Sequence, residues 1–444
     1  MATTYLTHTN SGTGSYQKST FSAWVKRNSL GATQCMWNNV VQAGVNQLRF
    51  EFNASDQIYL YGEEAGGYAL RANTTSLYRD TSSWYNIVVA IDTTQGTASD
   101  RIKLYVNGVQ VTLTFTTTPA QNANLRMNYN STPVYVGSNA TASYFDGLMS
   151  HVHWIDGTAY PATAFGETDS TSGIWKSKTS PSISEYGVNG FFLKFENASA
   201  MGTDSSGKSN TFTVGGGTPT QTKDSPDNNF ATMNRAFPLF TTTLSLGNTK
   251  FVTAGASWRS IGATLGMTTG KYYMEFKDLG GTNTAFGISD FTNGGVIDKI
   301  NRSVSTYTGN NANSYGYHKT GEFFYNGSYT GTGYDTYTTN NIIGMAVDMD
   351  NLKLYFHKNG TYQNSANPSA GSGGYTIATP VNTYIPTMSV NASTAIVNFG
   401  NGYFGTTAVT TNSGAGYAGT DGASIFNYQP PTGYSALSTK GLNT

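Results

Sequence analysis

The chain has 444 residues, of which 25 are basic and 25 acidic, so its formal net charge is zero. Charged residues make up only 11% of the sequence, against about 25% in typical soluble proteins. This balance gives no electrostatic footprint for nucleic acid or an anionic membrane surface, so we expect neither partner. No run of about 18 apolar residues occurs, so no membrane insertion is predicted either.

The cysteine count and the first residues indicate the compartment. Cys35 is the single cysteine, so no intrachain disulfide can form. Residues 1–14 lack a basic region and an apolar stretch, so we expect no secretory signal and folding in a cytoplasm. The 51 glycines and 30 tyrosines favour short strands and tight turns.

The first half alternates polar and apolar residues in short segments, with turn residues between them. This spacing, about 8–12 residues, favours an antiparallel sandwich over a parallel α/β fold. One short helical piece is expected at 161–167. The expected strands lie at 21–27, 48–54, 57–63, 84–92, 102–111, 132–138, 145–157 and 190–197.

The second half starts after a stretch rich in Gly, Pro and Thr at 215–226, which is typical of a linker. Further strands are expected at 271–279, 284–290, 313–327, 341–350, 352–360, 384–390 and 394–400. Residues 401–444 contain too few apolar side chains to form a core of their own, so we expect them to pack on the surface of a domain or a partner. We therefore predict a sandwich domain at 1–214, a linker at 215–243, a second sandwich at 244–400 and an extension at 401–444.

One sequence pattern occurs twice, at residues 84–111 and 341–362. Each copy is an apolar strand that ends in Asp92 or Asp348, then an alternating strand, an Asn-Gly pair and a return strand. Asn-Gly between alternating segments predicts a hairpin, because a type I′ turn needs positive φ at both central residues. The predicted fold class is all-β, with two antiparallel β-sandwich (jelly-roll) domains joined by the linker.

Two family resemblances follow from these segments. FSAWVKR, WYNIVVAID, LYVNGVQV, YVGS and FDGLMSHVHWIDG, within about 20–214, resemble laminin-G-like modules of the concanavalin-A-type jelly roll. GKYYMEF, AFGISD, NIIGMAVDMDNLKLYFHKNG and YIPTMSVNASTAIVNFG, within about 270–400, resemble a SPRY domain. Both families are two-sheet sandwiches, which accounts for the shared hairpin.

A third resemblance lies between and after the modules. SSGKSNTFTV, DSPDNNFATMN and PPTGYSALSTKGLN resemble joining and closing segments of bacteriophage virion proteins. It implies a virion structural protein on the tail or particle surface: a tail fibre, spike or other appendage that mediates attachment to a host-surface glycan or protein. It also implies other virion proteins as partners and a homo-oligomer, with a trimer favoured.

A capsid decoration or stabilising protein is the alternative. The first domain begins within about 20 residues, without a long N-terminal anchor, which favours a decoration protein or a short appendage. We then expect residues 401–444, or a sandwich face, to dock on the particle.

The sequence offers little for catalysis or metal binding. A glycoside hydrolase needs two carboxylates on one strand face, and Glu63-Glu64 are adjacent residues placed in a turn. Asp348 and Asp350 fit a turn better than a calcium loop, which lacks its Gly and Glu. His151 and His153 alternate on one strand face without a clear third ligand. We expect no enzyme, no metal and no cofactor; a polysaccharide-degrading enzyme is the less favoured alternative.

Two aromatic regions are candidates for ligand binding. Residues 313–337 combine Tyr with Ser, Gly and Asn, the composition of adaptable binding loops, although alternate tyrosines can also simply cover a sheet face. Loops near Trp37 and Asn38 and near Tyr68 are predicted to form a rim on the first sandwich. The candidate ligand-binding residues are Tyr315, Tyr317, Tyr325, Tyr329, Tyr334, Trp37 and Tyr68.

Overall fold

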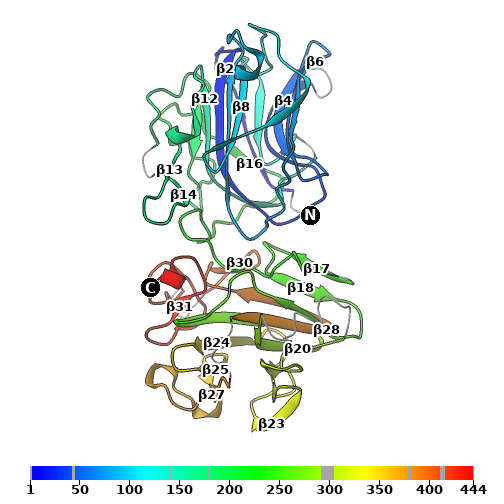
Figure 1. Ribbon diagram of the computed structural model, residues 1–444, viewed down its shortest axis with the longest axis vertical. Coiled ribbons are helices and arrows are strands. Elements are labelled where there is room, and N and C mark those ends of the chain that lie inside the picture. The colour runs from blue at the N-terminus through cyan, green and yellow to red at the C-terminus, as the bar shows by residue number, and fades with distance from the viewer. Residues whose placement is uncertain are drawn as a thin grey trace. The chain divides into compact units, whose positions relative to one another are not determined.

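The computed structural model forms two compact units, Met1–Gln221 and Thr222–Thr444 (Figure 1). It describes residues 3–42, 46–140, 142–178, 181–237, 239, 241–291, 305–378, 383–410 and 416–443. These residues form strands and short 3₁₀ turns, and both units are antiparallel sandwiches, so the predicted fold class is confirmed. Within these ranges no helix is long and apolar enough to cross a bilayer.

The first unit has an eight-stranded sheet and a six-stranded sheet, in which all neighbours are antiparallel. The eight-stranded sheet has the order β10 (Leu113–Thr117), β6 (Gly67–Thr74), β5 (Ile58–Glu64), β4 (Asn46–Phe52), β3 (Gln34–Gln42), β11 (Pro133–Val136), β1 (Tyr5–Thr9), β16 (Thr213–Gly215). The six-stranded sheet has the order β15 (Phe191–Leu193), β12 (Gly147–Asp156), β2 (Lys18–Arg27), β7 (Tyr85–Asp92), β8 (Ile102–Val106), β9 (Val109–Val111).

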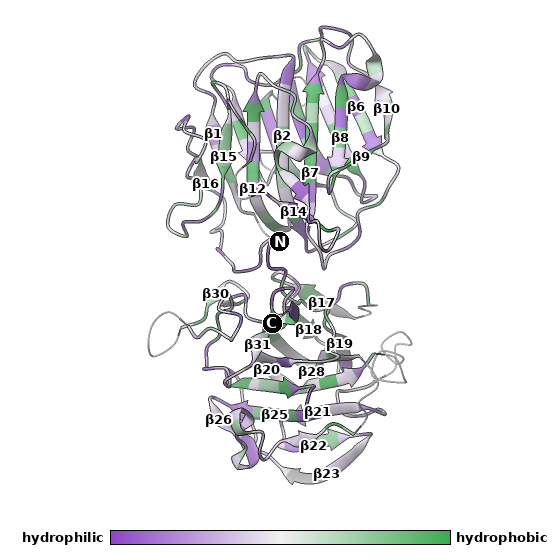
Figure 2. Ribbon diagram, turned by 60° about the vertical axis from the view of Figure 1, so that its left-hand side comes forward, coloured by the Kyte–Doolittle hydropathy of each residue, from purple (hydrophilic) through white to green (hydrophobic). Residues whose placement is uncertain are grey.

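The inward faces of these two sheets form the core, and Figure 2 shows apolar and polar residues alternating along the strands. Trp37 of β3 stacks on Trp154 of β12 with ring centroids 4.1 Å apart, which joins the two sheets. The outward face of the six-stranded sheet is partly covered by η2 (Ala162–Ala164), and the loop continues into the small sheet of β13 (Gly166–Thr168) and β14 (Trp175–Ser177).

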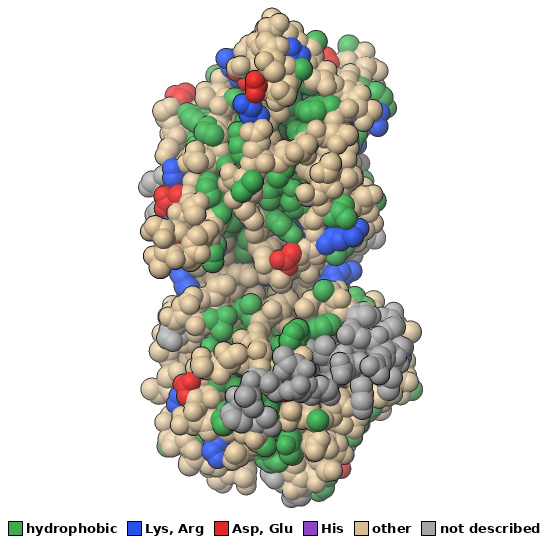
Figure 3. Space-filling view, in the orientation of Figure 1, with side chains coloured by type: hydrophobic (Ala, Val, Ile, Leu, Met, Phe, Trp, Pro, Cys, Tyr) green, Lys and Arg blue, Asp and Glu red, His purple; other side chains and the backbone are tan. Residues whose placement is uncertain are grey.

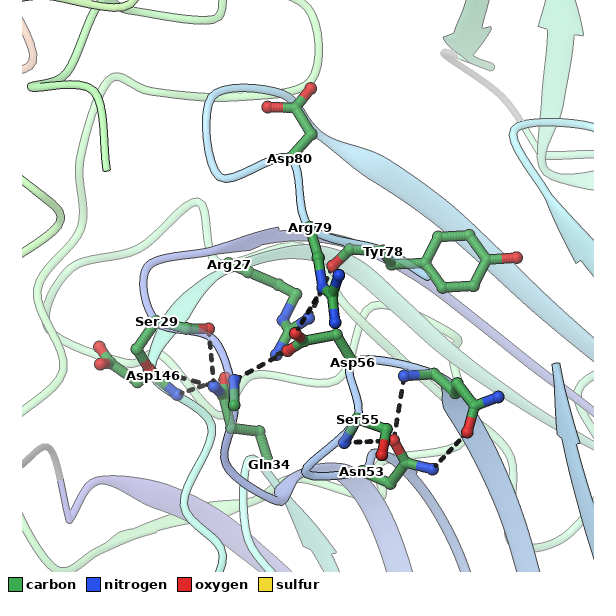
Figure 4. A network of polar contacts seen from close by, with 12 residues as sticks. Arg27, Ser29, Gln34, Asn53, Ser55, Asp56, Tyr78, Arg79, Asp80 and Asp146 are labelled. Carbon is green, nitrogen blue, oxygen red and sulfur yellow. Dashed lines mark hydrogen bonds and ion pairs between the residues drawn. The ribbon is translucent and has the colours of Figure 1, made fainter. Parts of the chain in front are cut away.

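A buried ion pair closes one end of this sandwich (Figure 4). Arg27 is fully buried, and its guanidinium lies 3.0 Å from Asp56 and donates to the carbonyl of Tyr78 at 2.6 Å. Asp56 also accepts from the Gly31 N–H at 2.9 Å and from Arg79 at 3.0 Å. Burial opposes ionisation of Asp56, but these bonds outweigh it and hold the carboxyl pKa below its usual value.

The second unit is built on two long strands, β20 (Lys271–Asp290) and β28 (Tyr384–Asn398), which pair with each other along both halves. The first half of β20 pairs with β24 (Ile342–Asp348), and the second half pairs with β21 (Ser314–His318). The sequence predicts two strands in place of each; the structure shows one strand that bends. Gly280 and Gly281 have φ of 106° and 111° at the β20 bend, which favours glycine.

The remaining strands extend these pairs. β25 (Lys353–Lys358) continues from β24, whereas β22 (Glu322–Tyr325) and β23 (Ser328–Gly333) continue from β21. The other elements are η1 (Ala98–Asp100), β17 (Thr242–Ser245), β18 (Lys250–Thr253), β19 (Arg259–Gly262), β26 (Thr361–Tyr362), η3 (Gln363–Ser365), η4 (Pro368–Ala370), β27 (Tyr375–Thr376), β29 (Tyr403–Phe404), β30 (Thr407–Ala408), β31 (Ser435–Ala436) and η5 (Gly441–Asn443).

Both predicted Asn-Gly hairpins are confirmed. Asn107 and Gly108 have φ of 48° and 81°, and Asn359 and Gly360 have φ of 49° and 88°. In each hairpin the Asn side chain also accepts a hydrogen bond of 2.8 Å from a backbone N–H at the start of the strand before the hairpin. The donor is Asn86 in the first unit and Ile342 in the second. The turn therefore sets the register of three strands in both units.

The boundary between the units, at Gln221–Thr222, lies inside the predicted linker at 215–243. Part of that range belongs to the two units, because Gly215 ends β16 and both Ala231 and Met233 lie in the core of the second unit. The predicted extension at 401–444 also belongs to the second unit, where Phe426, Tyr434 and Leu437 are buried.

Two of the three segments on which the third resemblance rests, 224–234 and 430–443, pair with each other, whereas 205–214 lies in the first unit. Ala231 N–H donates to the Leu437 carbonyl, and Asn229 and Thr439 exchange bonds at 2.9 and 3.0 Å. The Lys440 N–H donates to the Asn228 side chain at 3.2 Å. We call residues 228–231 and 437–440 the C-terminal clasp. Two segments about 200 residues apart in the chain therefore form one structural element.

A buried carboxylate anchors the segment before this clasp. Glu275 of β20 is fully buried and accepts the N–H groups of Asn427 and Tyr428 at 2.9 and 2.7 Å. The side chains of Tyr273 and Asn398 donate to the same carboxylate at 3.1 and 3.3 Å. Four donors thus converge on two oxygens, which fastens the C-terminal residues to the central strand.

The hydrogen bonds of His357 assign its tautomer. Its Nδ1 accepts from the Gly360 N–H at 3.1 Å, so Nε2 carries the proton and donates to the Tyr273 hydroxyl at 2.6 Å. Burial lowers the pKa of His357 to about 3, which keeps the ring neutral. Gly344 is required beside it, because a Cβ there would lie 1.9 Å from Nε2.

We predict that Phe426→Ala lowers the free energy of unfolding of the second unit by about 3–5 kcal/mol, the cost of emptying a buried aromatic site. Phe426 is fully buried and packs edge-to-face on Tyr273 with centroids 4.9 Å apart. Hydrogen exchange of the β20 amides measures this unit separately. Leu442→Ala, at a side chain that is 38% exposed, is the control and should change stability by less than about 0.5 kcal/mol. Equal effects of the two substitutions would contradict the assigned packing.

We predict that Asp56→Ala destabilises the first unit by about 3–5 kcal/mol, because it leaves Arg27 buried without its counter-ion. The pKa of Asp56 is lowered in the folded state, so its stabilising effect is present above about pH 4 and is lost as the pH falls through the folded pKa. The difference between wild type and Asp56→Ala in urea unfolding should therefore shrink below about pH 4. A pH-independent difference would show that the ion pair is not the cause.

Candidate ligand-binding face of the first unit

Three of the predicted ligand-binding residues are core residues, so the prediction is wrong for them. Trp37 is 1% exposed, because a bulge between Cys35 and Trp37 turns its ring inward against Trp154. Tyr315 and Tyr317 are fully buried, since they occupy alternate positions of β21 that face the core of the second unit. None of the three can contact a ligand in solvent.

The other tyrosines of residues 313–337 mostly pack on these two. Tyr325 stacks on Tyr315 with centroids 4.6 Å apart, and Tyr334 meets Tyr317 edge-on at 4.9 Å, so both are half-buried. Tyr329 is 50% exposed on β23. The segment therefore forms paired strands whose tyrosines mostly cover sheet faces, which is the alternative that the sequence analysis left open. Ligand binding through Tyr329 stays a prediction.

Tyr68 leads to a more substantial surface. It is 55% exposed on β6, and the neighbouring strands present polar side chains on the same outward face. The register places Asn38 of β3, Arg49 of β4, Tyr61 of β5 and Arg71 of β6 in one row across the sheet. The predicted rim near Asn38 and Tyr68 therefore lies on one sheet, carried by strands instead of loops.

Stacked rings and guanidinium groups organise this row. The Arg49 guanidinium lies 4.1 Å from the centroid of the Tyr61 ring, and that of Arg71 lies 4.5 Å from the Tyr68 ring. Arg71 Nε also donates to the Tyr59 hydroxyl at 3.0 Å, and the rings of Tyr61 and Tyr68 are 5.9 Å apart. We call these five residues the Tyr–Arg face.

Sequence reasoning missed four members of the Tyr–Arg face. Arg49, Tyr59, Tyr61 and Arg71 stand at the polar positions of alternating segments, where the period of two puts them opposite the core. That alternation could have identified them strand by strand. Only the pairing of β4, β5 and β6 shows that they meet.

The carboxylates beside this face are each held by a neighbour. Glu51 lies 3.1 Å from Arg49, and burial raises the pKa of its carboxyl despite that partner. Glu63 accepts from Gln47 at 2.5 Å and from the Tyr61 hydroxyl. Burial, together with the bond to Glu63, raises the pKa of Tyr61, so its hydroxyl stays a donor. These carboxylates fix the orientation of the Tyr–Arg face.

Asn38 is unusual at the edge of this face. Its side chain is 1% exposed, yet neither amide atom has a hydrogen-bond partner among the described residues. Its register neighbours are Tyr135 and Arg49. Burying an amide without partners costs free energy, and such groups are often found where a ligand or ordered water completes the bonding.

The other candidate groups have structural roles. The sequence predicts that His151 and His153 share one strand face. The structure has a bulge between Ser150 and His153, so the regular alternation of side chains is interrupted there. His153 is buried, its pKa is well lowered by burial, and its ring stacks on Phe192 at 3.8 Å. Glu63 and Glu64 end β5 instead of lying in a turn. No group of three metal-binding side chains occurs within the residues that the structure describes.

The comparisons with known proteins agree with the two units. Residues 1–163 match the family model of the concanavalin A-like lectin/glucanases superfamily, and residues 271–402 match that of the SPRY domain. The chain carries a laminin-G-like module followed by a SPRY domain. No curated protein sequence matches it.

Two solved SPRY structures are similar to part of the chain. The SPRY domain of human HERC1 is 14% identical with a TM-score of 0.28, over 36% of this chain and 96% of that one. The TRIM65 PSpry domain is 13% identical with a TM-score of 0.28, over 38% of this chain and 89% of that one.

We predict that Asn38→Leu, which is close in shape, raises the free energy of unfolding of the laminin-G-like module by about 1 kcal/mol, because it removes two buried unpaired polar atoms. Hydrogen exchange of the β4 amides measures the change. Asn39→Leu is the matched control: its amide already donates to the Pro133 carbonyl at 2.9 Å, so this substitution should destabilise. A loss of more than 1 kcal/mol in Asn38→Leu would contradict the assignment.

Proposed function

We propose that this protein binds host-surface glycans through its laminin-G-like module and acts as a structural component of a bacteriophage particle. The observation that carries the glycan proposal is the Tyr–Arg face, where ring and guanidinium planes lie side by side on the outward face of a rigid sheet.

The chemistry of this face suits a saccharide. Flat aromatic rings pack against the C–H faces of sugar rings, while guanidinium and amide groups hydrogen-bond hydroxyls. The bond between Arg71 and Tyr59 and the stacking of Arg49 on Tyr61 already restrict these side chains, so little rotamer entropy is lost on binding.

The virion part of the proposal rests on the resemblance of the joining and closing segments to phage structural proteins. A tail fibre, spike or other appendage is the preferred role, and a capsid decoration protein is the alternative. Many copies on one particle would multiply weak glycan contacts through effective concentration.

The chain has no net charge that would attract a charged polymer over a long range. On the face of the molecule shown in Figure 3, acidic and basic side chains lie singly or in small groups among neutral ones. Recognition must come from contact and shape.

We propose a binding role without catalysis. On the outward face of the eight-stranded sheet, Glu51 is paired with Arg49, and Glu63 is held by Gln47 and Tyr61. A glycosidase needs one carboxyl group free to donate a proton and a second free to attack or to activate water. Release of new reducing ends from host polysaccharide by the purified chain would overturn this role.

We predict that the full chain binds a subset of the glycans on an array of host-surface polysaccharides. Tyr68→Ala and Arg71→Ala should each weaken binding about tenfold, or about 1.4 kcal/mol. Phe291→Ala is the matched control, since this aromatic side chain is 49% exposed in the SPRY domain and belongs to no candidate site, and it should leave binding unchanged. Glycan binding that is indifferent to both substitutions would overturn the assignment to the Tyr–Arg face.

The virion assignment has its own test. Antibodies against the chain should label the surface of purified particles, and a density map should place the chain on the tail or the capsid. A truncation at residue 400 cannot test docking, because it removes the buried Phe426, Tyr434 and Leu437 from the SPRY domain. Absence of the chain from purified particles would overturn the virion role and leave glycan binding intact.

A further inference from the structure

The laminin-G-like module has a hollow on the outward face of the six-stranded sheet, away from the Tyr–Arg face. Its volume is about 280 Å³. Its lining includes Ala90 of β7, Lys103 and Tyr105 of β8, Asp100 of η1 and Tyr160.

The hollow exists because a small residue lies between larger neighbours. Ala90 pairs with Thr20 of β2 on one side and with Lys103 of β8 on the other. The Thr20 hydroxyl donates to the Thr158 carbonyl at 2.8 Å and accepts the Tyr160 N–H at 2.7 Å. The Thr20 side chain therefore holds in place the loop that carries Tyr160.

The loop that carries Asp100 is held by an arginine. The Arg101 guanidinium donates to the carbonyls of Gln95 and Gly96, each at 2.9 Å, and to that of Pro119 at 2.8 Å. These bonds shape that loop, in which Asp100 lies on η1. Both loops that line the hollow are thus held by the fold itself, as in most small-molecule sites.

The charges around the hollow cancel. Asp100 lies 3.1 Å from Lys103, and Asp92, which also lines the hollow, lies 3.5 Å from Lys18. Two carboxylates are therefore matched by two ammonium groups. An anionic or cationic ligand would gain from one pair member and be repelled by the other, so this arrangement favours a neutral polar ligand.

Size and lining narrow the ligand class further. A volume of about 280 Å³ lies just below the range of roughly 300–1,000 Å³ for drug-sized ligands and is large enough for about one sugar ring. The half-buried rings of Tyr105 and Tyr160 offer apolar faces, and Asp100, Lys103 and Gln95 offer both donors and acceptors. Apolar ring faces beside polar groups match a pyranose, which has C–H faces and an equatorial belt of hydroxyls.

We propose that this hollow is a second, independent binding site that accepts one neutral pyranose ring of a glycan. It requires no residue of the Tyr–Arg face. Because the two sites lie on outward faces of opposite sheets, one module bound at both would bridge two glycan chains.

The test uses the full chain and saturation-transfer NMR with a panel of methyl pyranosides of glucose, galactose, mannose and N-acetylglucosamine. Glucuronate and choline serve as charged comparators. We expect signal from at least one neutral glycoside and none from the comparators. Absence of signal from the whole neutral panel, or preference for a charged comparator, would overturn the proposal.

Variants locate the binding. Ala90→Leu fills part of the hollow and should raise the Kd of the bound glycoside at least tenfold, whereas Ala90→Ser keeps the space and should change it less than threefold. Tyr160→Ala removes an aromatic ring that lines the hollow and should also weaken binding. This variant tests the site if Ala90→Leu does not fold. Binding unchanged in Tyr160→Ala would overturn the site.

Variants distinguish glycan binding at the Tyr–Arg face from pyranose binding at the hollow. Tyr68→Ala should leave binding of the small glycosides at the hollow intact while weakening array binding. Loss of glycoside binding in Tyr68→Ala but not in Tyr160→Ala would assign the sugar to the Tyr–Arg face and overturn the second site.

Discussion

Strand register is the constraint on which the surfaces of both units depend. A slip of one residue would turn every side chain of a strand to the other face. In β4 and β5 the register is held by Leu48, Phe50 and Leu60, which are fully buried between the sheets. Because these residues are locked inward, Arg49 and Tyr61 must point outward and meet. The candidate site is therefore a consequence of core packing on the other side of the same strands.

The same device sets register in two unrelated sandwiches. In the laminin-G-like module Lys18 pairs with Asp92 at 3.5 Å, and in the SPRY domain Lys271 pairs with Asp348 at 3.0 Å. Each pair joins the start of one strand to the end of its neighbour, and each strand pair is followed by an Asn-Gly hairpin. A chain without a disulfide thus uses local turn chemistry and a few ion pairs to align strands whose burial supplies most of the stability.

The most distant pairings have the greatest structural effect. The Glu275 carboxylate holds residues 427–428 against a strand about 150 residues earlier, and the C-terminal clasp holds residues 437–440 against residues 228–231. The SPRY domain is therefore complete only when its last residues are in place. Its extension is an integral part of the fold. Leu442, at 38% exposed, is one of the C-terminal side chains that the fold leaves at the surface.

The sequence by itself determined the features that depend on near neighbours: the all-β class, the two modules and both Asn-Gly turns, because turn geometry and a period of two are local properties. It also placed Tyr68 on a candidate surface. It could not tell that Trp37 turns inward at a bulge, that Gly280 lets one strand serve two partners, or that Tyr315 and Tyr317 fill a core. Only the tertiary structure decided which outward residues meet, since pairing between strands brings together Asn38, Arg49, Tyr61 and Arg71 from four separate segments. A binding face is a property of several strands at once, and no single stretch of sequence contains it.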